Sequence, residues 1–167
     1  MQDFERNYMR TLRHIYDTEK QLVVSVRTIA ATACDARLIS TLRDIEVQSD
    51  NQAQRIEEIF RALYLEPRTE ASWATTALLR DAWEACASGS SGTQGCAAAL
   101  LAIKRYEITL YESLLRWSEQ CQLDEALPDI RRSIAEELVQ ASVLSELAFE
   151  EQVVQVALTT AERNALH

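Results

Sequence analysis

Apolar side chains recur every three or four residues along most of this chain, which is the spacing of one buried face of an α-helix. The first such stretch predicts a helix from about Asp3 to Thr32. Asp35 has the side chain of an N-cap for a second helix, which we expect Pro67 to end. The apolar stripes of these two helices are Phe4, Tyr8, Leu12, Ile15, Leu22, Val26 and Ile29, and Leu38, Leu42, Ile45, Ile56, Ile59 and Leu63.

The rest of the pattern predicts one short helix and two more long ones. The short helix runs from about Ser72 to Ala87 and carries Trp73, Leu79 and Trp83. The segment SGSSGTQG, residues 88–95, holds all three glycines and is expected to be a flexible linker. A third long helix covers about Cys96 to Cys121, and Pro128 opens the last helix, which reaches about residue 163.

Composition supports an all-α fold. The 167 residues include only three glycines and two prolines, too few for the many tight turns of a sandwich, barrel or doubly wound sheet. The length suits one domain, residues 1–167. The connection between the second and third long helices, about 30 residues with its own helix, is long enough to run along a bundle. We therefore predict a ferritin-like four-helix bundle with one crossover that carries a short fifth helix.

Charge and cysteine usage narrow the function classes. The formal net charge of −9 argues against nucleic acid, whose phosphates need clustered Lys and Arg. No apolar stretch is long enough to span a membrane, and the polar start MQDFERNYMR does not resemble a signal peptide. Cys34, Cys86, Cys96 and Cys121 lack C-x-x-C spacing, so we expect buried free thiols in a cytoplasmic protein. A redox role for Cys86 and Cys96, which flank the linker, is the alternative.

Each long helix also places polar residues on its apolar stripe near the middle. Burying a polar group without a partner is costly, so their coincidence in four helices indicates an internal polar network. Its members are Glu19, Gln52, Lys104, Glu107, Glu137 and Gln140.

Buried carboxylates from four helices are the basis of di-iron and di-manganese sites, in which two helices also supply Glu-x-x-His. This chain has only two histidines. His14 lies one residue off its stripe and His167 is the last residue. Gln140 stands where the motif after Glu137 wants His, and the ammonium of Lys104 cannot ligate a metal while charged.

These segments resemble the YciE/YciF-type ferritin-like stress proteins of bacteria. HIYDTEKQL, residues 14–22, is similar to that family's L-Y-D-A-E-K-Q-L signature, and KRYEITLY, residues 104–111, to its E-H-Y-E-I-x-x-Y. QRIEEIFRALYLEPR and AEELVQASVLSELA resemble its second-helix and fourth-helix patterns, so the resemblance covers about residues 4–150.

The resemblance implies a ferritin-like bundle, often dimeric, with a di-metal centre. It assigns Glu19, Glu107 and Glu137 to acidic ligand positions. Lys104 and Arg105 replace the family's Glu-His, Ala141 replaces an Asp, and Gln52 stands where His or Gln is usual. We therefore expect a fold that has lost its metal.

The resulting hypothesis is a metal-free helical protein that acts through protein contacts and is associated with stress, without enzymatic activity. The alternative is an oxidase or ferroxidase that binds iron or manganese; a carrier of small ligands in the bundle interior is a third interpretation. A second apolar line on the third and fourth long helices indicates a homodimer interface, or else covers the crossover helix. It comprises Ile103, Tyr106, Leu110, Leu114 and Trp117, with Phe149, Val153 and Val156.

Lys104 carries the sharpest expectation. Three inward glutamates without metal would repel one another in a low dielectric, and an ammonium among them neutralises one charge and donates hydrogen bonds. We predict that Lys104 bridges some of Glu19, Glu107 and Glu137, with Gln52 completing the network.

Overall fold

The computed structural model describes the backbone of residues 2–88 and 92–164, and the side chains of residues 5–88 and 92–149. Within these ranges the chain is helical and contains no strand, so the all-α prediction is confirmed. The elements are α1 (Gln2–Thr32), α2 (Ala36–Ala62), α3 (Trp73–Ala87), α4 (Gly92–Gln120), a 3-10 turn η1 (Asp124–Ala126) and α5 (Leu127–Asn164).

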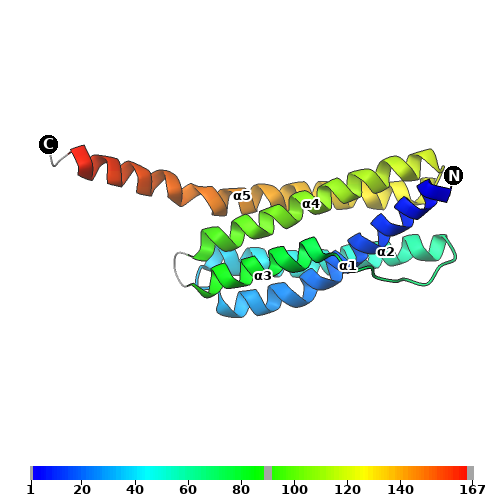
Figure 1. Cartoon of the computed structure of the whole chain (residues 1–167), viewed down its shortest axis with the longest axis horizontal. Coiled ribbons are helices and arrows are strands. Elements are labelled where there is room, and N and C mark those ends of the chain that lie inside the picture. The colour runs from blue at the N-terminus through cyan, green and yellow to red at the C-terminus, as the bar shows by residue number, and fades with distance from the viewer. Residues whose placement is uncertain (1, 89–91, 165–167) are drawn as a thin grey trace.

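The four long helices form two antiparallel hairpins, α1 with α2 and α4 with α5, which pack together through α1 and α4 and through α2 and α5. Helices α2 and α4 run in the same direction, because the connection that joins them, which contains α3, returns the chain along the length of the bundle (Figure 1). Helix α3 packs against α1 and α4. This is the predicted ferritin-like bundle with one crossover that carries a short helix.

Side-chain caps start two helices where the sequence suggested. Asp35 is the N-cap of α2 and accepts a hydrogen bond of 2.9 Å from the Leu38 backbone N–H. Ser72 caps α3 by accepting from the Thr75 N–H. The expectation that Pro67 ends the second helix is wrong. Helix α2 ends at Ala62, and the chain turns away at Tyr64, whose φ of 58° lies in the left-handed region.

The expected linker is also shorter than its glycine content suggested. Gly92 to Gly95 belong to α4, whereas residues 89–91 lie outside the described residues. Gly92 is required by close packing, because a Cβ there would lie 2.0 Å from the Ala85 carbonyl oxygen at the end of α3. The glycine therefore serves the contact between α3 and α4 rather than a loop.

The interior consists of two apolar clusters, one toward each end of the bundle. The first cluster includes Leu22, Val26, Ile29, Leu38, Leu42, Ile45, Leu79, Leu100, Ile103 and Leu144. The second includes Tyr8, Leu12, Ile15, Ile56, Ile59, Phe60, Tyr111, Leu114 and Ile130. Along each long helix, buried polar residues lie between the positions that belong to the two clusters. We call these residues the polar layer: Thr18, Glu19, Ser49, Gln52, Lys104, Glu107, Ser133, Glu137 and Gln140.

The second apolar line of the third long helix mostly faces inward. Ile103 and Leu114 are fully buried within the chain, and Tyr106, Leu110 and Trp117 are half-buried. Ile103 belongs to the first cluster and Leu114 to the second, against which Leu110 and Trp117 also pack, so most of this line contributes to the core of the single chain. Phe149 on α5 differs, because it is 52% exposed. The side chains of Val153 and Val156 lie outside the described residues.

Candidate functional site

The polar layer brings together the three glutamates and the lysine that the sequence analysis singled out. Glu19 comes from α1, Lys104 and Glu107 from α4, and Glu137 from α5, and none of the four side chains is exposed. One carboxylate oxygen from each glutamate lies within 4.8 Å of the others. Residues that are 118 positions apart in sequence, 19 and 137, thus belong to one buried cluster.

Lys104 lies among these carboxylates. Its Nζ is 2.9 Å from Glu107 Oε2, one helical turn along α4, and 3.1 Å from each carboxylate oxygen of Glu137 on α5. The ammonium therefore joins the two helices of the second hairpin through a buried ion pair. Such a pair is favourable only when its geometry compensates for the lost hydration of both charges.

Glu19 is held by a residue that the sequence analysis did not single out. The Tyr111 hydroxyl donates a 2.7 Å hydrogen bond to Glu19 Oε1, and Tyr111 is itself fully buried. The Ser49 hydroxyl of α2 also interacts with Glu19, and this interaction partly offsets the rise in the pKa of Glu19 that burial causes. The spacing of Tyr111 four residues after Glu107, on the same face of α4, was the available signal.

Burial dominates the acid–base properties of this layer. Desolvation raises the pKa of Glu19 from 4.5 to about 7, although Lys104 opposes this shift. Desolvation, followed by the charge of Glu137, raises the pKa of Glu107 well above its usual value. Desolvation lowers the pKa of Lys104, but Glu107, Glu137 and Glu19 outweigh it and raise that pKa overall. Lys104 is therefore charged at neutral pH, and burial favours the protonated forms of Glu19 and Glu107.

The two predicted glutamines lie in the layer but bond elsewhere. Gln52 Nε2 donates to the Ser133 carbonyl oxygen at 3.5 Å and to Glu136 Oε2 at 3.4 Å, rather than to the carboxylates around Lys104. Gln140 donates to the Gln48 side-chain oxygen. Each amide therefore joins α2 to α5.

Glu136 is a partner that the sequence analysis missed. Arg55 and Arg132 both donate to its carboxylate, from α2 and from one turn earlier on α5. Desolvation alone would raise the pKa of Glu136, but these arginines outweigh it and lower the pKa. This ion pair fastens α2 to α5 beside the polar layer.

A second polar contact, also missed, fixes the crossover helix. Thr18 of α1 and Thr75 of α3 share a buried hydrogen bond of 2.9 Å, and Asp17 accepts from the Ser72 backbone N–H at 2.8 Å. Hydroxyl and short acidic side chains are common at helix starts, so the sequence alone does not indicate this contact between α1 and α3.

The donor set does not fit a di-metal centre. His14 approaches Glu70 of the crossover connection, with Nε2 and Oε1 3.5 Å apart, and His167 lies outside the described residues. No imidazole in the described part of the chain joins the three glutamates. The Lys104 ammonium lies between two of the expected ligands, where it would repel a metal cation.

The cysteines divide into two kinds. Cys86 and Cys96 are buried, whereas Cys34 and Cys121 are exposed, so the expectation of buried thiols is wrong for the latter two. All four are free. Burial, with a contribution from Cys86, raises the pKa of the Cys96 thiol to about 12. A thiol in this state is a poor nucleophile, which disfavours the redox alternative for that pair.

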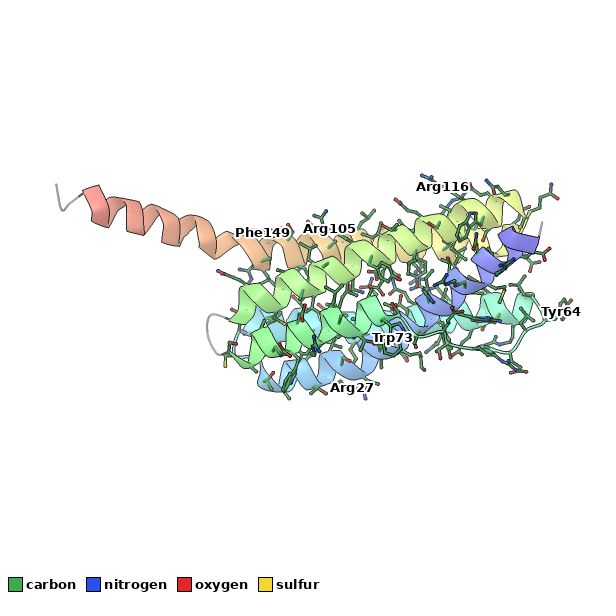
Figure 2. The ribbon with its side chains drawn as sticks, in the orientation of Figure 1. Arg27, Tyr64, Trp73, Arg105, Arg116 and Phe149 are labelled. Carbon is green, nitrogen blue, oxygen red and sulfur yellow. The ribbon has the colours of Figure 1, made fainter. Side chains whose placement is uncertain are left out.

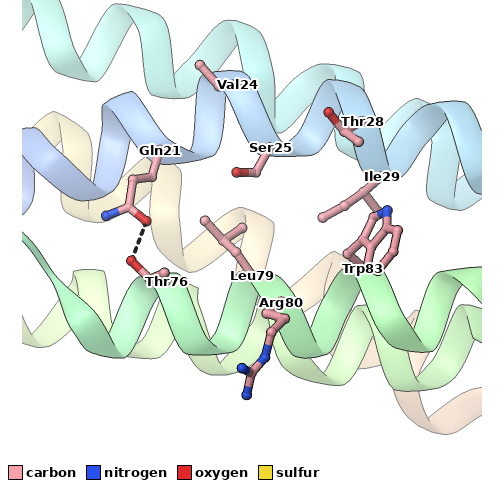
Figure 3. A pocket seen from close by; sticks show the side chains of 9 residues that line it. All are labelled: Gln21, Val24, Ser25, Thr28, Ile29, Thr76, Leu79, Arg80 and Trp83. Carbon is pink, nitrogen blue, oxygen red and sulfur yellow. Dashed lines mark hydrogen bonds between the residues drawn. The ribbon is translucent and has the colours of Figure 1, made fainter.

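A hollow lies on the outside of the bundle, between α1 and α3 (Figure 3). It measures about 330 Å³ and is lined by Gln21, Val24, Ser25, Thr28, Ile29, Thr76, Leu79, Arg80 and Trp83. It is separate from the polar layer. The third interpretation, a carrier that holds a ligand in the bundle interior, therefore gains no support from this hollow.

Comparisons with known proteins agree with this architecture. A family model described as a domain of unknown function, DUF892, matches residues 3–158. The crystal structure of the E. coli stress protein YciF superposes with a TM-score of 0.82 at 22% identity, covering 89% of this chain and 96% of that chain. YcfI from Rhodopseudomonas palustris, described as a candidate structural protein, gives 0.80 at 23% identity, covering 87% and 95%.

At these identities the two structures establish a common fold and no more. No curated protein sequence is significantly similar to this chain. None of the described helices combines the length and apolar character needed to cross a membrane.

Proposed function

This chain belongs to the DUF892 family, and we propose that it is a metal-free member that acts through contacts with other proteins. Its likeness to the E. coli stress protein YciF supports an association with stress. The observation that carries the proposal is the position of Lys104 Nζ, 2.9 Å from Glu107 and 3.1 Å from Glu137. An internal ammonium supplies the positive charge that a metal pair would otherwise supply to these carboxylates.

The main alternative, an oxidase or ferroxidase with two iron or manganese ions, is poorly supported by the residues present. It needs ligands where this chain has Lys104 and Gln140, and those side chains already make contacts within the bundle. Metal analysis of protein purified from cells supplied with both metals tests the proposal. We expect only traces. Iron or manganese in stoichiometric amount would overturn it.

The contact surface that we propose is the outer face of α5. Leu138, Val139, Val143 and Phe149 are 40–66% exposed, so α5 carries apolar residues on its outer side as well as toward the core. A helix that is apolar on two sides needs a second neighbour. Phe149 lies on the side of the molecule away from Arg27 and Trp73 (Figure 2). A second copy of this chain is the partner that we propose for this face.

Light scattering over a dilution series tests the dimer. We expect twice the monomer mass of 18.9 kDa, with Val139→Asp shifting the protein toward the monomer. Val47→Asp is the matched control, because Val47 is 64% exposed on α2 and Val139 is 66% exposed on α5. A wild-type mass of one chain at every concentration would contradict the proposal, as would equal effects of the two substitutions.

A further inference from the structure

The hollow between α1 and α3 lies between two points at which the crossover helix is attached to α1. Near the start of α3, the Thr76 hydroxyl donates a hydrogen bond of 2.9 Å to Gln21 Oε1. Near its end, the Cys86 thiol lies 3.8 Å from the Ile29 carbonyl oxygen. The hollow of about 330 Å³ lies along the helices between these contacts (Figure 3). Its volume is within the range of small-molecule sites, about 300–1,000 Å³.

Apolar side chains form much of its wall. Ile29 and Leu79 are buried, whereas Val24 is 67% exposed and Trp83 is 44% exposed. Figure 3 shows the indole ring of Trp83 beside Ile29, at one end of the hollow. An indole that is partly exposed in a hollow can pack against a second aromatic ring in a stacked or edge-to-face arrangement.

The polar groups that remain available around the hollow can donate hydrogen bonds. In the described part of the chain, the Ser25 hydroxyl and the Trp83 indole N–H have no hydrogen-bond partner, whereas Gln21 and Thr76 bond each other. A hydroxyl can donate or accept, and an indole N–H can only donate. These groups therefore suit a ligand that carries acceptor oxygens.

Arg80 gives the hollow a positive charge. It is the only ionisable residue among the described residues that line the hollow, although the chain has 26 acidic and 17 basic residues. Its Nε lies 3.6 Å from Glu84 Oε1, but the two side chains are 71% and 61% exposed, so this ion pair holds Arg80 weakly. Figure 3 shows the guanidinium on the side of α3 away from α1, so rotation of the side chain is needed to bring it to a ligand.

We propose that this hollow binds a small aromatic carboxylate. The ring of the ligand packs against Trp83 and Leu79, and its carboxylate pairs with Arg80 and accepts a hydrogen bond from the Ser25 hydroxyl. The site lies apart from the polar layer, and Phe149 of the proposed dimer face lies on the side of the molecule away from Trp73 of α3 (Figure 2). The inference therefore goes beyond the proposed function and does not depend on it.

Titration of the ¹⁵N-labelled full chain with 1-naphthoate tests the inference by NMR. The chain has three tryptophans, Trp73, Trp83 and Trp117, whose indole N–H signals are assigned with single Trp→Phe variants. We expect the Trp83 signal to shift saturably, with a Kd of about 1 mM or tighter. The Trp73 signal should stay in place, because Trp73 is 79% exposed on the same helix but does not line the hollow.

Matched ligands and variants assign the charge. The neutral 1-naphthamide should bind the wild type about tenfold more weakly than 1-naphthoate, because it lacks the charge-assisted bond to Arg80. Arg80→Gln should remove this difference and leave the binding of the amide unchanged. Arg27→Gln is the matched control, because Arg27 is an exposed arginine of α1 that pairs with Glu46 and does not line the hollow. It should bind both ligands as wild type does.

Three outcomes would overturn the inference: no saturable shift of the Trp83 signal, equal shifts of the Trp73 and Trp83 signals, or equal binding of the acid and the amide by the wild type. Equal shifts would mean that 1-naphthoate adsorbs to any exposed indole. The same preference for the acid in Arg80→Gln as in wild type would also contradict the assigned role of Arg80. None of these results changes the metal content or the mass in light scattering, which test the proposed function.

Discussion

The polar layer and the two apolar clusters beside it are equally buried but are stabilised in different ways. Leu12 and Leu100, in the apolar clusters, are 0% exposed, as are Lys104 and Glu137 in the polar layer. Each apolar side chain contributes on its own, about 1.5–3 kcal/mol for a fully buried leucine. Each member of the polar layer is costly alone and becomes tolerable only through its partners.

The two regions should therefore fail differently. Damage to an apolar cluster depends on the volume removed and is independent of pH. Damage to the polar layer depends on the charge that is left behind, so it should vary with pH in the range where the glutamates titrate. The same degree of burial thus gives one robust part of the core and one conditional part.

Lys104→Met should have the largest effect. Removing one partner of a buried ionic network typically costs roughly 3–5 kcal/mol, because it leaves unpaired charge in the interior. Glu19, Glu107 and Glu137 face the ammonium, and Tyr111 and Ser49 face Glu19. Without Lys104 the three carboxyl groups must bind additional protons or remain unpaired.

The direction of the pH dependence follows from Glu19. Its pKa in the folded protein, about 7, lies above the ordinary 4.5, so ionisation of Glu19 destabilises the folded protein as pH rises through this window. Loss of Lys104 removes the group that opposes this shift. The loss in free energy of unfolding should be larger at about pH 7.5 than at about pH 5.

Urea unfolding of wild type, Lys104→Met and Lys20→Met at both pH values measures this. Lys20 is exposed, so its variant should stay within about 0.5 kcal/mol of wild type. A similarly small loss for Lys104→Met at the higher pH would show that the internal counterion contributes nothing.

Leu100→Ala should come next and sharpens the comparison. Leu100 is fully buried in the cluster on the α3 side of the polar layer, and truncation of a buried leucine costs about 2–5 kcal/mol through lost burial and a cavity. No charge changes, so the loss should be the same at both pH values. Urea unfolding under the same two conditions measures it, and a strong pH dependence would contradict the division between the two regions.

The sequence predicted the features that depend on local spacing. Apolar residues spaced three or four apart predicted the helices. The same spacing placed Glu19, Lys104, Glu107 and Glu137 on the buried faces, because the position of a residue along a helix determines the face on which its side chain lies. Lys104 was also expected to bridge these glutamates, and the structure places its Nζ against Glu107 and Glu137.

What the sequence missed depends on neighbours from distant segments. Gln52 was expected beside Lys104, but the direction of its amide is set by Ser133 and Glu136 on α5. Gly92 read as a loop residue because glycine is locally flexible, whereas its role is set by Ala85 on another helix. Such contacts arise only when the helices pack, so no pattern within one helix contains them.

Tyr111→Phe should have the smallest effect of the three and tests the boundary between the regions. Tyr111 packs in the second apolar cluster while its hydroxyl donates to Glu19 at 2.7 Å. The substitution keeps the ring and removes only that donor, so the expected loss is about 1.5–3 kcal/mol, the range for a hydrogen bond to a charged group. The loss should shrink toward pH 5, where Glu19 is protonated and the bond is between neutral groups.

Tyr8→Phe is the matched control, because the buried Tyr8 hydroxyl bonds the neutral Ser118 hydroxyl at 3.2 Å, and its smaller loss should not change over this range. Urea unfolding of both variants at the two pH values distinguishes the roles: equal, pH-independent losses would mean that Tyr111 acts only as an apolar ring and that the polar layer ends at Glu19.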